Sequence, residues 1–215
     1  KSKLADLANL DINSEVIQGL RNDNVKTIDG VLYSNVYDAC LFRYVGTTTA
    51  SGAITTNGTA TATATGGFNV YHARGMRKKL RSVNAPPIPG TGRYAAILSL
   101  DAEEGLYADS AWTNFQHYTN SAGILNGYIG TMYGIDFVVE TNSLSGNEVY
   151  MVGWGYGTED LVMPPEVRTN AAIAAMMGSS SDFGRKIDLA WYEMAAFGTL
   201  WNDAAQCHCI KFDTA

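Results

Sequence analysis

Apolar side chains recur at helical spacing near the start of the chain. Residues 4–20 predict a helix that breaks near Asp11 and restarts with Ser14 as its cap. Residues 29–45 predict a second helix of about four turns, with Asp29 as its cap and Gly46 where a glycine commonly ends a helix. The apolar positions of this second helix are Tyr33, Val36, Tyr37, Cys40, Leu41 and Tyr44.

Further helices are predicted before and after a proline-rich segment. Residues 68–83 return to helical spacing and stop at residues 84–90, where three prolines within four residues impose an extended backbone. Residues 101–118 predict a helix in two pieces, the first capped by Asp101 and the second by Asp109 or Ser110. The apolar face of the helix over 68–83 consists of Ala73, Met76, Leu80 and Val83.

Alternation of apolar and small or polar residues predicts strands in the second half of the chain. Residues 129–139 predict one long half-buried strand, and residues 149–154 its partner across a turn at residues 145–147. Shorter elements follow: strands at 93–99, 187–191 and 206–212, and a short helix at 195–201. This mixture predicts an α+β fold.

Two segments lack such periodicity. Residues 47–67 are almost entirely Thr, Ala and Gly without a charge, so we expect an exposed loop, with Asn57-Gly58 as a tight hairpin turn. Residues 164–181 run from a Pro-Pro pair through Ala- and Met-rich stretches and predict a surface excursion.

The composition is that of a globular protein with one large or two small domains. Of the 215 residues, 46% are hydrophobic and 17% charged, and no apolar run is long enough to span a bilayer. Three cysteines are an odd set, which argues against a disulfide framework and predicts an intracellular origin. The first residue is not Met and no signal peptide precedes the first helical stretch, so we expect a processed or trimmed chain.

The charges are segregated along the chain. Residues 68–100 carry six bases and no acid, whereas residues 101–167 carry ten acids and no base. This pattern favours either a contact between one copy and the opposite face of a neighbour, or a contact between the two segments within one chain.

Sequence motifs of catalysis and cofactor binding are absent. The Gly-rich stretch at residues 153–157 lacks the dinucleotide-binding spacing, and no phosphate-binding loop or nucleophile elbow occurs. In Cys207-His208-Cys209 a strand would direct the thiols to one face and the imidazole to the other, so we expect two buried thiols and no metal site. Asp136 and Glu140 would lie roughly 13 Å apart on one strand, too far for a two-carboxylate mechanism. The chain is therefore expected to be no enzyme and to need no cofactor.

One polar constellation has a specific spacing. Positions i, i+3, i+4 and i+7 of the helix over 68–83 gather four cations on one side: Arg74, Arg77, Lys78 and Arg81. These residues predict a surface that binds acidic side chains of a neighbouring copy or phosphate groups. The alternative is an ordinary solvated helix face.

From residue 84 onward the order of segments resembles the major capsid proteins of tailed bacteriophages. The resemblance spans residues 68–215 and rests on order and spacing, since no single piece is a strict signature. The segments on which the resemblance rests are a basic helix ending in Asn84-Ala85-Pro86-Pro87, then residues 92–98, an acidic helical region with Trp112, residues 129–142, Val149-Tyr150, Gly153, and an aromatic segment over 191–200.

The resemblance implies the capsid-shell fold, with a peripheral domain built on a long spine helix and long sheet, and an axial domain. It places an N-terminal segment at 1–28, the peripheral domain at 29–100 with the spine helix at 29–45 and the loop 47–67, the axial domain at 101–182, and a return to the peripheral domain at 183–215. The N-terminal arm and extended loop usual in the family have no room in the first 28 residues. Ser99-Leu100 stands where relatives often have a His-Pro pair.

By this resemblance the chain is a structural subunit that self-assembles into an icosahedral capsid around double-stranded DNA. Its implied partners are other copies in hexamers and pentamers, scaffold or portal proteins, and packaged DNA bound without sequence specificity, with assembly in the bacterial host cytoplasm. The alternatives are an encapsulin-like compartment shell, a phage-derived binding or decoration module, and an enzyme of unfamiliar type that uses His117.

Overall fold

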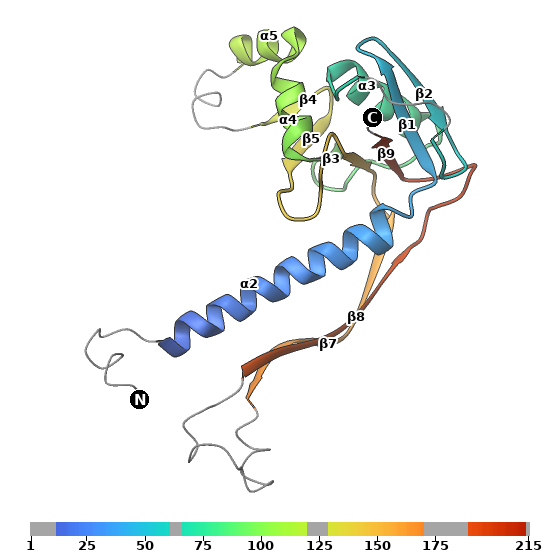
Figure 1. Ribbon diagram of the computed structural model, residues 1–215. Helices are drawn as coiled ribbons and strands as arrows, with labels where there is room; N and C mark the ends of the chain where they lie inside the picture. Colours follow the sequence, from blue (N-terminus) through green and yellow to red (C-terminus); the bar gives the residue numbers. More distant parts are fainter. Residues whose placement is uncertain (1–11, 61–65, 120–128, 170–188, 214–215) are drawn as a thin grey trace, which may run out of the picture. The chain divides into compact units, whose positions relative to one another are not determined.

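The computed structural model describes residues 12–60, 66–119, 129–169 and 189–213 (Figure 1). The chain divides into two compact units. Residues 32–158 and 197–215 form the unit that we call the sheet unit, and residues 1–31 and 159–196 form the one that we call the long-helix unit. Among the described residues, no helix is both long and apolar enough to cross a membrane.

A seven-stranded mixed sheet organises the sheet unit, in the order β2-β1-β9-β6-β3-β5-β4. Strands β1 and β9 pair in parallel, as do β3 and β5, whereas β6 runs antiparallel to both β3 and β9. The strands are β1 (Phe42–Thr48), β2 (Ser51–Thr55), β3 (Tyr94–Leu98), β4 (Thr131–Met132), β5 (Ile135–Val139), β6 (Val149–Val152) and β9 (Cys209–Asp213).

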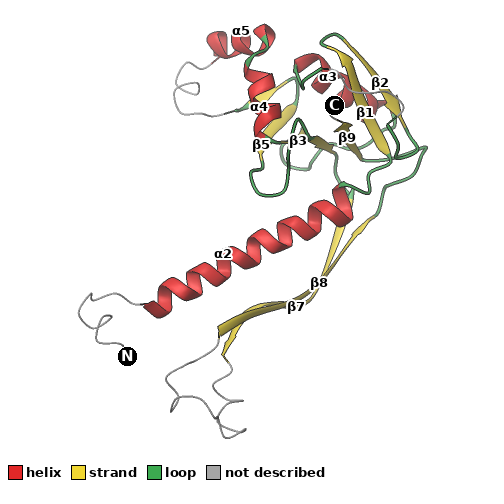
Figure 2. Cartoon of the chain, viewed as in Figure 1, coloured by secondary structure: helices red, strands yellow, loops and turns green. Residues whose placement is uncertain are grey.

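Helices α3 (Val70–Ser82), α4 (Leu100–Tyr107) and α5 (Ser110–Thr119) belong to the same unit (Figure 2). Helix α3 packs on the sheet through His72, whose ring lies 5.5 Å from that of Tyr44 and 5.3 Å from that of Phe212. Helix α5 contributes Trp112, which meets Phe137 edge to face at 5.2 Å. These contacts bury aromatic and aliphatic side chains of alternate strand positions, and this apolar burial stabilises the unit.

The segment before β1 contacts other residues of the sheet. It is a short π-helical turn, η1 (Tyr33–Tyr37), whose two tyrosine rings lie 6.0 and 5.6 Å from the ring of Tyr150 on β6. The hydroxyl of Tyr156 donates a 2.8 Å hydrogen bond to the carbonyl oxygen of Val36 and ties this turn to the chain after β6.

The long-helix unit contains most of α2 (Ile12–Leu32) and of the two-stranded sheet β7 (Gly157–Thr169) and β8 (Leu189–Thr199). Polar contacts hold these elements together. The Asn24 side chain donates to Glu193 Oε2 at 2.7 Å, and the Trp191 indole donates to Asp23 Oδ2 at 2.9 Å.

The structure corrects the helix predicted over 29–45. Helix α2 is continuous through Ser14 and Asp29, so neither residue is a cap, and the helical conformation ends with η1 at Tyr37. Residues 42–48 form β1 because pairing with β9 outweighs the helical spacing of the apolar residues. Residues 1–11 lie outside the description, and with them the predicted break near Asp11.

The strand predicted over 129–139 is instead a hairpin. Strands β4 and β5 are antiparallel and joined at Tyr133-Gly134, both with positive φ (51° and 70°), which is the conformation of a two-residue hairpin turn. Alternation continues across such a turn, so the pattern concealed it. Strand β6 over 149–152 is confirmed, but it pairs with β3 and β9 rather than with β5.

Residues 47–67 are not simply a loop, because β1 extends to Thr48 and pairs with β2 through a turn at Thr49-Ala50. Asn57-Gly58 does not join two strands. Backbone pairing with β1 orders this charge-free segment even though it has little to bury. Residues 61–65 lie outside the description.

Near the C-terminus, residues 195–199 continue β8 rather than forming a helix, because pairing with β7 overrides the helix propensity of alanine. Residues 164–169 of the predicted excursion belong to β7, whose Pro164-Pro165 fits a sheet of only two strands, where each strand has a free edge. Residues 170–188 lie outside the description.

The remaining predictions agree better with the structure. Helix α3, strand β3 and strand β9 are confirmed, as is the division of 101–118 into two helices. The first of these two is capped by Ser99, whose hydroxyl accepts from the Ala102 amide, and not by Asp101. Asp109 precedes the second and accepts from the Ala111 amide at 2.8 Å.

Candidate functional site, a basic face on helix α3

Helix α3 is amphipathic and fixed at both ends. Asn69 accepts a 3.1 Å hydrogen bond from the His72 amide at the N-terminus, and the chain leaves the C-terminus through Asn84, which has a φ of 56°. Its sheet-facing side is buried, with Val70, His72, Ala73, Met76 and Leu80 as the buried residues. The opposite side of the helix is therefore the one presented to solvent.

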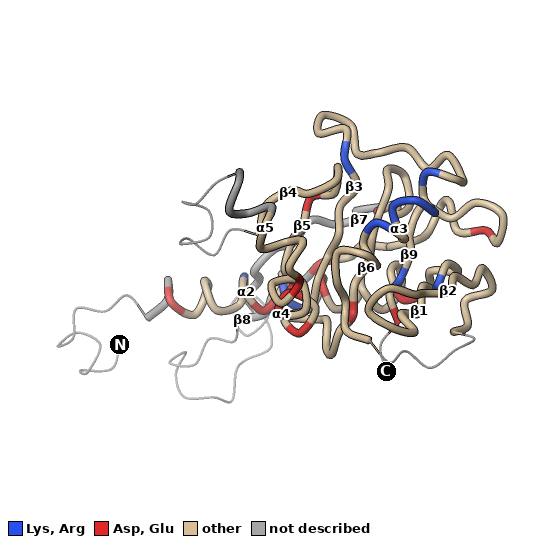
Figure 3. Tube along the Cα trace, turned by 90° about the horizontal axis from the view of Figure 1, so that it is seen from above, with Lys and Arg blue, Asp and Glu red and all other residues tan. Residues whose placement is uncertain are grey.

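The four predicted cations lie together on that outward side. Arg74, Arg77, Lys78 and Arg81, which we call the basic face, line one open hollow of about 410 Å³ together with Tyr133 from the β4–β5 turn. Arg74, Lys78 and Arg81 are exposed and Arg77 is half-buried. Figure 3 shows the concentration of blue along α3.

The β4–β5 turn helps to shape this hollow. The Arg74 guanidinium lies 5.2 Å from the centre of the Tyr133 ring, a cation–π contact. A side chain at Gly134 would bring its Cβ within 3.1 Å of Arg77 Nη2, so the turn approaches Arg77 closely. The buried Arg77 Nε has no hydrogen-bond partner among the described residues.

No carboxylate neutralises the basic face within the described part of the chain, where none of its four cations forms an ion pair. One ion pair does join the basic segment 68–100 to the acidic segment 101–167 among the described residues, because Arg93 Nη1 lies 3.0 Å from Asp136 Oδ1. The predicted alternative of pairing within one chain therefore holds for Arg93 but not for the basic face.

Helix α4 has the opposite character. Asp101, Glu103 and Glu104 give it three acids and no base, and Asp101 and Glu104 are exposed without an ion pair among the described residues. Leu100 and Tyr107 are 57% and 40% exposed. We call Leu100, Asp101, Glu104 and Tyr107 the acidic face of α4.

The arrangement offers charge for binding rather than groups for bond making. Four clustered cations beside an aromatic ring bind carboxylates or phosphates. Both helices lie within the part of the chain that matches a known family. A comparison with protein families gives a match to the phage capsid proteins over residues 8–208, nearly the whole chain.

The chain belongs to the phage capsid protein family. The resemblance that the order of segments indicated is confirmed.

Solved capsid structures share the fold of this family member. The capsid of Cyanophage P-SCSP1u matches with a TM-score of 0.61 and 11% identity, over 98% of this chain and 69% of that chain. The acidic stable capsid of Helicobacter pylori bacteriophage KHP30 matches with a TM-score of 0.59 and 10% identity, over 97% and 70%. The head structure of Helicobacter pylori bacteriophage KHP40 gives 0.58 and 9%, over 99% and 72%. The predicted α+β capsid-shell fold is confirmed.

Two further matches show how much of its relatives' length this chain spans. This capsid protein spans 47% of the matched chains from Mycobacterium phage Che8 and Cyanophage Pam1. A comparison with curated proteins gave no significant match.

The cysteines lie in the core of the sheet unit, as predicted for Cys207 and Cys209. Both are buried free thiols, and Cys40 joins them with its Sγ 3.9 Å from Cys207 Sγ. Burial raises the pKa of the Cys40 thiol, and the hydrogen bond with Cys40 together with burial raises the pKa of Cys207. Cys40 and Cys207 are therefore protonated packing groups at neutral pH.

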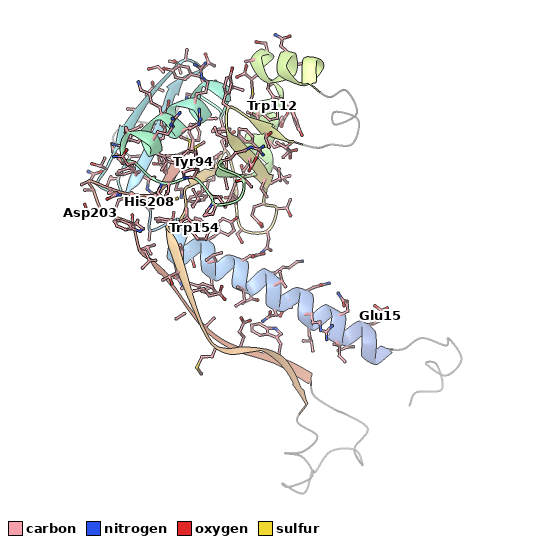
Figure 4. The ribbon with its side chains drawn as sticks, turned by 180° about the vertical axis from the view of Figure 1, so that it is seen from behind. Glu15, Tyr94, Trp112, Trp154, Asp203 and His208 are labelled. Atoms are coloured by element: carbon pink, nitrogen blue, oxygen red, sulfur yellow. The ribbon has the colours of Figure 1, made fainter. Side chains whose placement is uncertain are left out.

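His208 lies apart from the thiols and stacks on the Trp201 ring at 5.2 Å. Its Nδ1 lies 2.8 Å from the Trp154 carbonyl oxygen, and Figure 4 shows His208 beside Trp154. Within the described residues, no group of three or more His, Cys, Asp or Glu side chains could hold a metal ion.

The remaining sequence candidates do not converge. The Gly-rich stretch turns the chain between β6 and β7, with Gly155 at a φ of 77°. Asp136 pairs with Arg93, whereas Glu140 Oε1 accepts from the Asn142 amide at 2.6 Å. His117 lies in α5, and its side chain is outside the description.

Sequence reasoning missed a charged cluster on the sheet. Lys211 of β9 is only 9% exposed, and its Nζ lies 2.6 Å from Asp38 Oδ1 and 3.1 Å from Glu148 Oε1. Burial lowers the pKa of Lys211, but hydrogen bonds to Asp38, Tyr150 and Glu148 outweigh it and leave the pKa raised. A lysine on a strand gives no sequence signal that its partners come from residues 38 and 148, so nothing local could have revealed this cluster.

Proposed function

We propose that many copies of this protein form the icosahedral shell of a tailed phage that encloses double-stranded DNA. The observation that carries the proposal is the family match over residues 8–208, which covers both compact units. The seven-stranded sheet unit supports it physically, because a rigid, well-packed body can present fixed surfaces to identical neighbours.

The two units also suggest a domain assignment that differs from the sequence-based one. The long-helix unit contains the 21-residue helix α2 and the long strands β7 and β8, which fit the spine helix and long sheet of a peripheral domain. The sheet unit then corresponds to the axial domain. The sequence-based boundaries 29–100, 101–182 and 183–215 stay an alternative prediction. The division into two units is favoured because the seven-stranded sheet takes strands from all three of those ranges.

The proposal extends to partners that the family membership alone does not specify. Scaffold and portal proteins would contact the assembling shell in the bacterial host cytoplasm, and the packaged DNA would face its interior without sequence-specific binding. The net charge of −6 supports loose contact with DNA, because like charges repel each other.

Electron microscopy with mass determination tests the proposal on the protein expressed alone. We expect closed shells of uniform diameter. Monodisperse monomers or dimers at high concentration and at several salt levels would contradict it and favour a binding or decoration module. Shells that enclose a protein cargo in place of DNA during infection would contradict the DNA-packaging role and favour an encapsulin-like compartment.

A further inference from the structure

The basic face of α3 and the acidic face of α4 are both without ion pairs in the described part of the chain. Five cations and no acid occur on α3, and three acids and no base on α4. Lys79 is the one α3 cation directed elsewhere, since its Nζ lies 4.7 Å from the centre of the Phe42 ring. Four cations on α3 and two carboxylates on α4 therefore remain available to a partner.

The two faces also match in length. The basic face runs from Arg74 to Arg81 and the acidic face from Leu100 to Tyr107, so each covers seven residue steps, or about 10 Å of helix. Two helical faces of equal length can lie against each other with several charge pairs in register.

Exposed apolar side chains accompany the charges on both faces. Tyr71 is 46% exposed and lies three residues before Arg74 on the same side of α3, and Tyr133 at the hollow is 48% exposed. On α4, Leu100 and Tyr107 flank the carboxylates. Aromatic and aliphatic groups beside charges are typical of protein interfaces, in which tyrosine and arginine are enriched.

Building on the proposed shell function, we propose that the basic face of α3 receives the acidic face of α4 from a second copy. The contact is head to tail, because it uses two different surfaces of each copy. Repetition of such a contact by rotation closes a ring, which is the form that a capsomer requires.

The exposed apolar side chains favour this occupant over a nucleic-acid phosphate. Every copy of the chain brings one basic face and one acidic face. The exposed Leu100 and Tyr107 give the Tyr71 and Tyr133 rings an apolar counterpart. A phosphate backbone offers no such apolar group. Binding of DNA by the basic face is the alternative outcome of the test.

Charge reversal on each face tests the contact. Lys78→Glu with Arg81→Glu reverses exposed positions of the basic face that touch no described partner, and Asp101→Lys with Glu104→Lys reverses the acidic face. Combining all four substitutions restores opposite charges with the polarity exchanged. Circular dichroism and thermal melting check that each variant folds.

Sedimentation at low salt measures the association of the folded proteins. We expect each double reversal to weaken association at least about tenfold and the fourfold variant to return to within about threefold of the unmodified chain. Recovery in the fourfold variant separates pairing of the two faces from a loss of folding.

The opposing outcomes are distinct. Association equal to that of the unmodified chain in both double reversals overturns the contact and leaves the shell function standing, whereas an unmodified chain that never associates overturns both. A third outcome assigns the basic face to phosphate instead. In that outcome the fourfold variant does not recover association, and only the α3 double reversal loses binding to double-stranded DNA.

Discussion

The sheet unit and the long-helix unit are held together in different ways. The sheet unit buries large apolar side chains completely, among them Leu98, Ile210 and Phe212. In α2, by contrast, Asn24 is the one residue of the long-helix unit whose side chain is described as buried. Val16 and Val25 of the same helix are 42% and 59% exposed. The sheet unit therefore has the core of a domain that folds alone, whereas the contacts described between α2 and β8 are polar.

This difference indicates where assembly matters most. A region with little buried apolar surface gains stability when neighbours cover it, whereas a region with a full core gains little. We expect the sheet unit to be preformed in a free subunit and the long-helix unit to become more stable in the shell.

The largest expected effect comes from the core of the sheet. Ile135→Ala removes a fully buried side chain from β5 and should lower the free energy of unfolding by about 2–5 kcal/mol. Val138→Ala on the same strand is the matched control, because Val138 is 54% exposed and should cost less than about 0.5 kcal/mol. Urea denaturation measures both, and equal effects would mean that the sheet unit lacks the core described here.

The charged cluster on β9 should matter less than the core. Lys211→Met leaves Asp38 and Glu148 without their nearest cation and should cost about 1–3 kcal/mol, discounted because Asp38 is largely exposed. Lys78→Met on α3 is the control and should change the unfolding free energy by less than about 0.5 kcal/mol. A loss at Lys211 as large as that of Ile135→Ala would show that polar contacts also dominate the sheet unit.

Acidification should destabilise the sheet unit through His72. Burial lowers the pKa of this imidazole, so the unfolded chain binds the proton more readily. Stability is therefore complete above about pH 6.5 and falls as the pH drops below it, by at most about 1.4 kcal/mol per pH unit for one proton. His72→Phe should flatten this dependence in chemical denaturation between pH 5 and 7, and an unchanged slope would assign it to other groups.

The smallest expected effect lies in the long-helix unit. Asn24→Ala removes the hydrogen bond to Glu193 and should cost about 0.5–1 kcal/mol, seen as faster amide exchange in α2 rather than as global unfolding. Asn22→Ala, at an exposed position of the same helix, serves as the control. Global unfolding by Asn24→Ala would indicate that the two units fold as one.

The parts of the fold that sequence predicts well have local signals. Helix α3 carries its cap at Asn69 and its proline stop, and β3 begins after a turn-rich segment. The spacing predicts helix over residues 42–45, because their strand partner β9 lies more than 160 residues away along the chain. No local pattern reports such a pairing.

The candidate site was predictable in part. Helical spacing alone gathers Arg74, Arg77, Lys78 and Arg81, and the structure places them in one hollow. The contribution of Tyr133 depends on the turn between β4 and β5, which the alternation concealed. The acidic face of α4 depends on the burial of Ala102 and Leu106, which leaves Asp101 and Glu104 on the exposed side of that helix.

The most direct test of the central claim is an electron microscopy structure of the assembled shell at side-chain resolution. The account predicts that Lys78 or Arg81 of one copy lies within about 4 Å of Asp101 or Glu104 of its neighbour in the same capsomer. A basic face of α3 that lies open to the enclosed DNA, with the acidic face of α4 in contact with solvent, would contradict it.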